Sequence, residues 1–197
     1  KGKAGQWLLD PIDVFISIGA EGGSVNVTDT PDFTSTGDTP GVVTNGDIQA
    51  ALNAGTSVTI TTGDETVPSA PDLGDITFAE GVTIAKTAGG DATLTLNAIN
   101  SILGGTAASI TSTAGRLNLD FNADSDASGA GAITLGNMLI ATNGGNVRFY
   151  GGSDPVNGRA VGTSFEAGIS LDGTSISTLA AGGGAGGNVT LRNELAE

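Results

Sequence analysis

The sequence has no cysteine and no histidine among its 197 residues. Without cysteine there are no disulfides, thiolate nucleophiles, iron–sulfur clusters or cysteine-type zinc sites. Without histidine there is no imidazole base and no histidine metal ligand. Most hydrolase mechanisms therefore lose a component. We expect a protein that is not an enzyme and that needs no cofactor or metal to fold.

Cations are scarce as well. Seven Lys and Arg residues stand against 21 Asp and Glu residues, which gives a formal net charge of −14. Such a chain repels a phosphate backbone, so we expect no nucleic-acid partner. No apolar run approaches the roughly 18 residues of a membrane-spanning helix, so we expect no membrane insertion.

Aromatic residues make up only 4% of the chain, whereas hydrophobic residues make up 38%. So few large side chains cannot fill a broad core, yet the apolar content is too high for a disordered chain. Just over half of the residues are Gly, Thr, Ser, Asn and Asp. The apolar side chains must therefore be spread thinly along an elongated core.

A short pattern recurs, in which β-forming residues alternate with Thr, Ser or Asn and a Gly or Asp closes the unit. It predicts strands with one buried and one exposed face at residues 57–61, 75–78, 92–97, 116–122, 132–135, 146–149, 168–171 and 188–191. The first apolar positions are Val58, Ile76, Leu94, Leu117, Ile133, Val147, Ile169 and Val189. Their spacing predicts an all-β fold, a parallel β-helix (β-solenoid) with coils of about 20 residues. At the usual strand spacing, residues 57–191 would form a rod roughly 30 to 40 Å long.

We expect one β-helix segment over residues 1–197, with irregular coils at 1–55 and regular coils at 56–192. Strands are predicted at residues 6–9 and 12–18, the latter with Ile12, Val14, Ile16 and Ile18 on one face and Phe15 on the other. Residues 28–46 indicate a loop. Residues 47–55 predict a helix that Asn45 or Asp47 can cap and Gly55 can end, with Ile48, Ala51 and Leu52 on one face.

Four stretches resemble one protein family: the WLLDP motif at residues 7–11 followed by Ile12-Asp13-Val14, and residues 47–63, 117–129 and 142–151. They are similar to the filamentous-haemagglutinin-like exoproteins of two-partner secretion, which are large bacterial surface adhesins. The resemblance implies a right-handed parallel β-helix that is secreted to the bacterial cell surface. It also implies export by an outer-membrane transporter and a structural or adhesive role in attachment or biofilm formation.

The sequence departs from that family in one respect. Members carry a secretion domain with Asn-Pro-Asn motifs that the transporter recognises, and this sequence has no Asn-Pro pair. We therefore expect the chain to lie downstream of that domain and to depend on it for export. Surface glycans, exopolysaccharide and end-to-end contacts with other copies are the remaining candidate partners. A β-helix protein that binds or cleaves polysaccharide is the alternative function.

An acidic cluster is the candidate calcium site. Asp120, Asn122, Asp124 and Asp126 place oxygen ligands at every second position, as at the start of an EF-hand loop. Ser125 stands where that loop needs Gly, and Gly131 stands where it needs a bidentate Glu. A solvated acidic corner after a strand is therefore the favoured interpretation, and we expect no metal here.

The candidate glycan site is Tyr150 with Asn146, Arg148 and Asp154, because sugar sites combine an aromatic ring with carboxylates or amides. Phe149 and Tyr150 alternate along a strand, so one should be buried and the other exposed. An ordinary surface tyrosine is the simpler interpretation.

Two other patterns bear on rival functions. Arg116, Asp120, Arg148 and Asp172 could align on adjacent coils as in a polysaccharide-cleaving enzyme. The Thr-x-Thr pairs at residues 59–61 and 93–95 suggest an ice-binding face, although two pairs do not form an array.

Residues 182–187 (GGGAGG) satisfy G-x-G-x-x-G, but a predicted strand follows, which favours a loop between coils over a dinucleotide site. The sequons at Asn26 and Asn188 are interpreted as strand positions.

Overall fold

The computed structural model describes residues 6–9, 13–18, 22–23, 32–33, 41–62, 74–154, 156–162 and 168–195. Short strands, one helix and one 3₁₀ turn make up its regular structure. They are β1 (Gln6–Leu9), β2 (Val14–Ser17), β3 (Gly22–Gly23), β4 (Asp32–Phe33), β5 (Gly41–Thr44), α1 (Asn45–Asn53), β6 (Ser57–Thr61), β7 (Ile76–Phe78), β8 (Thr83–Lys86), β9 (Ala92–Asn97), β10 (Ile102–Gly104), β11 (Ser109–Ser112), β12 (Leu117–Ala123), β13 (Ile133–Leu135), β14 (Leu139–Ala141), β15 (Val147–Gly151), β16 (Ala160–Gly162), β17 (Ile169–Ser170), β18 (Ser175–Ser177), η1 (Ala181–Gly183), β19 (Val189–Leu191) and β20 (Asn193–Leu195).

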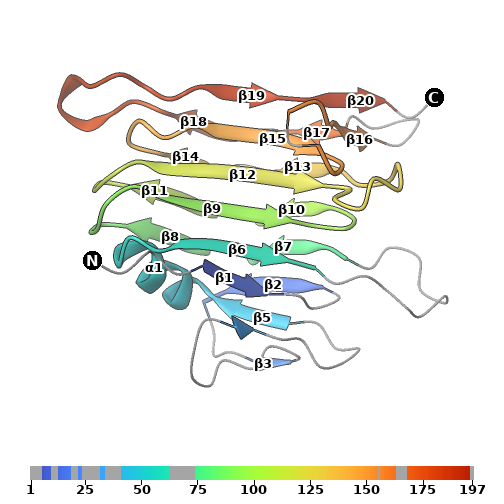
Figure 1. Ribbon diagram of the computed structural model, residues 1–197, viewed down its shortest axis with the longest axis horizontal. Coiled ribbons are helices and arrows are strands. Elements are labelled where there is room, and N and C mark those ends of the chain that lie inside the picture. The colour runs from blue at the N-terminus through green and yellow to red at the C-terminus, as the bar shows by residue number, and fades with distance from the viewer. Residues whose placement is uncertain are drawn as a thin grey trace.

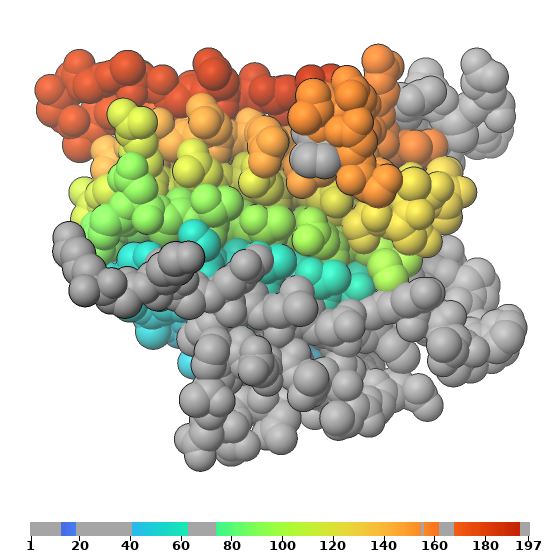
Figure 2. Space-filling model, in the orientation of Figure 1, coloured from blue at the N-terminus to red at the C-terminus, as the bar shows by residue number. Residues whose placement is uncertain are grey.

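The chain visits three sheets in turn and returns to the first, so that successive coils stack on one another (Figure 1). Sheet 1 has the order β19-β15-β12-β9-β6-β1-β4, sheet 2 the order β17-β13-β10-β7-β2-β5-β3, and sheet 3 the order β18-β14-β11-β8. Pairing between coils is parallel, and β3 with β5 is the antiparallel exception among the described strand pairs. Figure 2 shows the coils as stacked layers of colour. The expected all-β, parallel, solenoid-like fold is therefore confirmed.

The coils are longer than the predicted 20 residues. Ile76 pairs with Ile102, 26 residues further along the chain, and Val147 pairs with Val189, 42 residues further. The predicted period was wrong because it treated strands of different sheets as equivalent: Val58 lies in sheet 1 and Ile76 in sheet 2. The stack is shorter in consequence. From β6 to β19 sheet 1 has four strand spacings, or about 19 Å, rather than 30 to 40 Å.

Rows of apolar side chains from the three sheets fill a narrow core. Each row stacks residues that face one another in register, and all are at most 1% exposed. The rows are Val58, Leu94, Leu119 and Val147 in sheet 1; Val14, Ile76, Ile102 and Ile133 in sheet 2; and Ile84, Ile110 and Ile140 in sheet 3. Phe121 and Phe149 stack with ring centroids 5.0 Å apart. A core this thin needs few aromatic residues, which explains the composition.

The predicted core positions hold in the middle of the stack but not at its last coil. Leu117 is fully buried, as expected, whereas Ile169 is only half-buried and Val189 is 43% exposed. Val189 pairs with Val147 but lies on the last strand of sheet 1, so the described residues cover it from one side only. Its assignment to the core was therefore wrong.

The N-terminal helix is confirmed with a different cap. Helix α1 covers Asn45–Asn53, and it is Thr44, rather than Asn45 or Asp47, whose side chain accepts a hydrogen bond from the Asp47 N–H. The helix ends before Gly55, whose φ of +77° is a conformation that glycine adopts without strain. Ile48, Ala51 and Leu52 are its buried residues, as predicted.

Two other N-terminal predictions need correction. Part of the expected loop at 28–46 is strand β5, whose backbone pairs with β2. Ile18 is 64% exposed because β2 ends at Ser17, although Val14 and Ile16 are buried and Phe15 faces outward as expected. Ile12 and the sequon at Asn26 lie outside the described residues.

Helix α1 also closes one edge of sheet 3. Three amide side chains spaced four residues apart, Asn45, Gln49 and Asn53, face the free edge of β8. Asn45 Nδ2 donates to the Thr83 carbonyl at 2.7 Å, and Gln49 Oε1 accepts from the Ala85 N–H at 3.0 Å. The helix thus satisfies backbone groups that a further strand would otherwise pair. In the described part of the chain, this helix is neither long nor apolar enough to cross a membrane.

Candidate functional site

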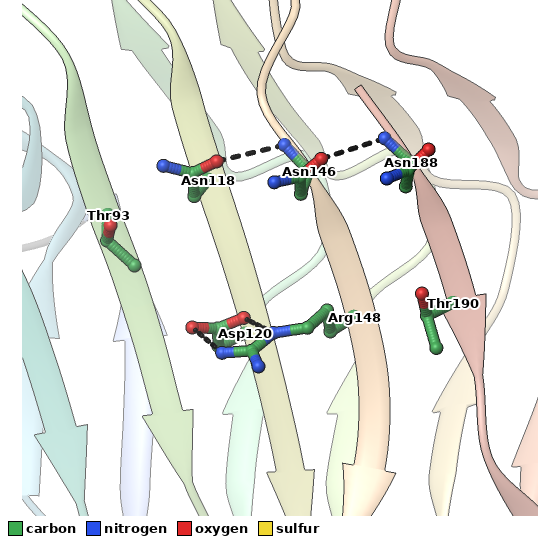
Figure 3. Close-up of a pocket in the computed structure, with 7 residues that line it drawn as sticks. All are labelled: Thr93, Asn118, Asp120, Asn146, Arg148, Asn188 and Thr190. Atoms are coloured by element: carbon green, nitrogen blue, oxygen red, sulfur yellow. Dashed lines mark hydrogen bonds and ion pairs between the residues drawn. The ribbon is translucent and has the colours of Figure 1, made fainter. Parts of the chain in front are cut away.

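A hollow of about 350 Å³ lies on the outward face of sheet 1 (Figure 3). It crosses four neighbouring strands, β9, β12, β15 and β19. The residues that line it are all polar: Thr93, Asn118, Asp120, Asn146, Arg148, Asn188 and Thr190.

Strand alternation and register bring these side chains together. In β12, Leu119 and Phe121 point into the core, so Asn118 and Asp120 point outward. Asp120 faces Arg148 of the next coil, and Arg148 faces Thr190 of the coil after it. The same four-residue pattern, Asn-apolar-polar-apolar, occurs at residues 118–121, 146–149 and 188–191, which places the three asparagines in one column.

An ion pair occupies the centre of the hollow. Arg148 Nε lies 2.6 Å from Asp120 Oδ1, and Arg148 Nη2 lies 2.7 Å from Asp120 Oδ2, so the contact is bidentate. The arginine side chain is 40% exposed and the aspartate side chain 14%. Hydrogen bonding to Asp120 raises the pKa of Arg148 further above its ordinary value. The pair is therefore fixed in geometry and close to neutral in net charge.

The asparagine column joins successive coils. Asn118 Oδ1 accepts a hydrogen bond from the Asn146 N–H at 2.9 Å, and Asn146 Oδ1 accepts one from the Asn188 N–H at 2.8 Å (Figure 3). Because each oxygen is engaged by the next coil, the NH₂ groups of Asn118 and Asn146 are left to face solvent, without a partner among the described residues.

The predicted glycan residues are only partly brought together. Asn146 and Arg148 line the hollow, but Asp154 lies in a separate turn, where it accepts hydrogen bonds from the Val156 N–H at 2.8 Å and from Asn157 Nδ2 at 2.8 Å. The expectation that Phe149 or Tyr150 is exposed was wrong, because both are buried.

Burial of Tyr150 has a clear structural cause. Its side chain is 6% exposed, and the Arg148 guanidinium carbon lies 5.5 Å from the ring centroid. At this end of β15, strand β16 also packs against β15. Burial raises the pKa of the Tyr150 phenol. The Tyr150 ring therefore packs against the Arg148 guanidinium and is not exposed to bind a sugar.

The structure separates the predicted calcium ligands. Asp120 is bound to Arg148, Asn122 is 7% exposed beside Asn97, and Asp126 Oδ1 accepts from the Ser128 N–H at 3.2 Å. Asp124 is 3% exposed, so the cluster is not the fully solvated corner that we expected. No group of three or more acidic metal-binding side chains occurs among the described residues.

The buried Asp124 carboxylate organises its own turn. Asp124 Oδ1 accepts hydrogen bonds from Ser128 Oγ at 2.9 Å and from the Gly129 N–H at 3.0 Å. Burial is the main reason that the pKa of Asp124 is raised above its ordinary value, and the Asp126 side chain raises it further. When folding raises the pKa of a carboxyl group, the group stabilises the folded state at pH values below its unfolded pKa, where it is protonated. This stabilisation is lost as the pH rises through the folded-state pKa.

We therefore expect Asp124→Asn to raise the thermal unfolding midpoint at pH 7 and to lose this advantage near pH 3. Asparagine can still accept both hydrogen bonds, and it tolerates the φ of +52° at this position. Melting curves across this pH range test the prediction.

Asp154→Asn is the control, because hydrogen bonding from Asn157 lowers the pKa of Asp154 and the sign reverses. This substitution should lower the midpoint at pH 7 slightly and not at pH 3. A destabilised Asp124→Asn at pH 7 would contradict the assigned role of burial.

The other rival patterns are not assembled. Asp120 and Arg148 are paired, but the other two residues lie elsewhere. Arg116 lies just before β12, where its backbone N–H binds the side chain of Asp91, and Asp172 follows β17 of sheet 2. The two Thr-x-Thr pairs meet at one position, where Thr59 faces Thr95, because Thr61 faces Asn97 instead. Asp120 and Arg148 then follow Thr95 in the same row. Residues 182–187 lead into β19 and not into a helix, so the loop interpretation is confirmed.

Sequence reasoning missed Asn118, considered Thr93 only in a Thr-x-Thr pair, and considered Asn188 and Thr190 only as a sequon. The recurring Asn-apolar-polar-apolar pattern was the available signal for Asn118, Asn188 and Thr190, because aligning its copies places them beside Asn146 and Arg148. No protein-family description matches the sequence, and no curated protein matches it.

Proposed function

We propose that this chain is a structural and adhesive segment of a secreted bacterial surface adhesin, whose coils wind in the right-handed sense. One observation carries the proposal: three parallel sheets run continuously through the stack, with an apolar core inside and polar residues on the outward face of sheet 1. The sequence resemblance supports the surface location. It also supports export by an outer-membrane transporter that acts through a domain not included in this chain.

The stack has the properties of a spacer. Each coil buries its apolar residues against its neighbours and pairs its backbone with them, so stiffness and length accumulate with every added coil. Right-handed winding is supported by the strong general preference for right-handed crossovers between parallel strands of a sheet.

The site geometry favours binding over catalysis. The carboxylate in the hollow, Asp120, has both oxygens engaged by Arg148 and is therefore poorly placed to act as a general acid or base. We accordingly propose a non-enzymatic role.

End-to-end contacts between copies would use the last coil, where Val189 and Leu191 are 43% and 51% exposed.

Antibody fragments raised against the purified chain test this proposal on intact cells of the source bacterium. They should label cells without permeabilisation and reduce cell attachment to surfaces, whereas fragments against a cytoplasmic protein should do neither. Labelling that requires permeabilised cells would contradict the surface location. Labelling of intact cells with unchanged attachment would contradict the adhesive role.

A further inference from the structure

The geometry points to the hollow on sheet 1 as a binding site for neutral glycans, with the Asp120–Arg148 pair and the asparagine column as its contact groups. This inference rests on the proposed adhesive function and specifies the ligand class of that function. Its arguments come from the charge, hydrogen-bonding capacity, rigidity and direction of the hollow.

The charge of the hollow selects against acidic ligands. Arg148 is the one cation in its lining, and Asp120 neutralises it through two hydrogen bonds. The whole chain carries a formal charge of −14. A sulfated, sialylated or uronate-rich glycan would therefore approach a negative protein without finding an unpaired cation, whereas a neutral glycan meets no such repulsion.

The hydrogen-bonding groups match hydroxyl-rich ligands. Arg148 keeps N–H donors beyond the two that Asp120 engages, and the Asp120 oxygens keep lone pairs that can accept. The asparagine NH₂ groups add donors along the column, while Thr93 and Thr190 each add a hydroxyl. Because a sugar hydroxyl both donates and accepts, two adjacent hydroxyls can bind the Asp–Arg pair together.

The contact groups are held before a ligand arrives. Arg148 is fixed by the bidentate contact and by the Tyr150 ring beneath it. The oxygens of Asn118 and Asn146 are fixed by the backbone of the following coil. Binding therefore immobilises few additional rotamers, which lowers its entropic cost.

The hollow runs along the stack and not along one strand. It crosses β9, β12, β15 and β19, three strand spacings or about 14 Å, and so favours linked sugars lying across the strands. Tyr150 is buried, so the hollow lacks a stacking ring, and each site should bind weakly. Many copies on one cell would then supply the avidity.

The test compares wild type with Arg148→Gln on an array of neutral, sialylated and uronate-containing oligosaccharides. Arg116→Gln is the matched control, because it removes an arginine that does not line the hollow. Wild type and Arg116→Gln should bind neutral glycans, and Arg148→Gln should bind them at least about tenfold more weakly, as expected for lost hydrogen bonds to a charged group. Wild type and both variants should have equal unfolding midpoints, so that a loss of binding is not a loss of folding.

Titration of ¹⁵N-labelled wild type with the best neutral oligosaccharide provides the second readout. The side-chain NH₂ signals of Asn118, Asn146 and Asn188 should shift together. Binding confined to acidic glycans, equal binding by Arg148→Gln, or no binding to any neutral glycan would overturn the inference. The antibody experiment is independent of it, so inhibited attachment without glycan binding would reject the hollow and leave the adhesive role intact.

Discussion

Replacing Leu117 with aspartate should unfold the chain under conditions in which wild type is native. Leu117 is fully buried in β12, and β12 has strands on both sides in sheet 1. The substitution places a carboxylate among apolar side chains without a partner, and we expect a loss of about 4 kcal/mol or more. Such a loss is a large part of the stability of an ordinary domain. Thermal and denaturant unfolding followed by circular dichroism measure it.

Thr134→Asp is the matched control. Thr134 lies in β13 directly after the buried Ile133, but its own side chain is exposed. The same new charge should therefore change the free energy of unfolding by no more than about 0.5 kcal/mol. Similar unfolding midpoints for the two variants would show that the inward and outward faces have been assigned incorrectly.

Gly145→Ala should be the second strongly destabilising change, even though it adds a single methyl group. A Cβ atom at Gly145 would lie within 3.0 Å of backbone atoms of Leu117 in the neighbouring coil. Backbone cannot rotate away as a side chain can, and the coils are hydrogen-bonded here through the Leu117 N–H and the Thr142 carbonyl. We expect a cost of about 3 kcal/mol, at the upper end of values for overpacking.

Gly136→Ala separates this close approach from the general effect of removing a glycine. A Cβ atom at Gly136 would have no atom within 4 Å apart from those of its own chain neighbours, and the backbone there is not in the left-handed region. The substitution should be neutral or stabilise the chain by up to about 1 kcal/mol through the unfolded state. Equal destabilisation of the two variants would contradict tight stacking of coils at Gly145.

The strands were predictable because alternation is a local property. The predicted bounds of β6 and β9 match the structure, since each strand alternates apolar and polar residues over its whole length. The coil length was not predictable in the same way. Loops of different length separate the strands, and a strand such as β18, with one half-buried Ile176 between two serines, gives almost no signal. The third side of that coil is therefore not apparent from the sequence.

The site was partly present in the sequence. Arg148 and Asn146 were recognised as glycan candidates and Asp120 as a metal candidate, and Asp120 and Arg148 were among four residues that could align on adjacent coils. Which of those four meet depends on the register between β12 and β15. Aligning residues 118–121 with 146–149 would have placed Asp120 beside Arg148. Burial of Tyr150 could not have been foreseen, because it depends on where the chain beyond β15 returns.

Surface display tests most directly the account that the folded stack attaches cells to neutral glycans. The chain and its Leu117→Asp variant, each with an epitope tag, are displayed at equal density on a bacterium that does not itself attach. Cells that attach under flow to a neutral-glycan surface are then counted. Wild type should hold several times more cells than Leu117→Asp, because the contact surface exists only on the folded stack. Attachment by wild type that is no greater than that of cells displaying the tag alone would contradict the account.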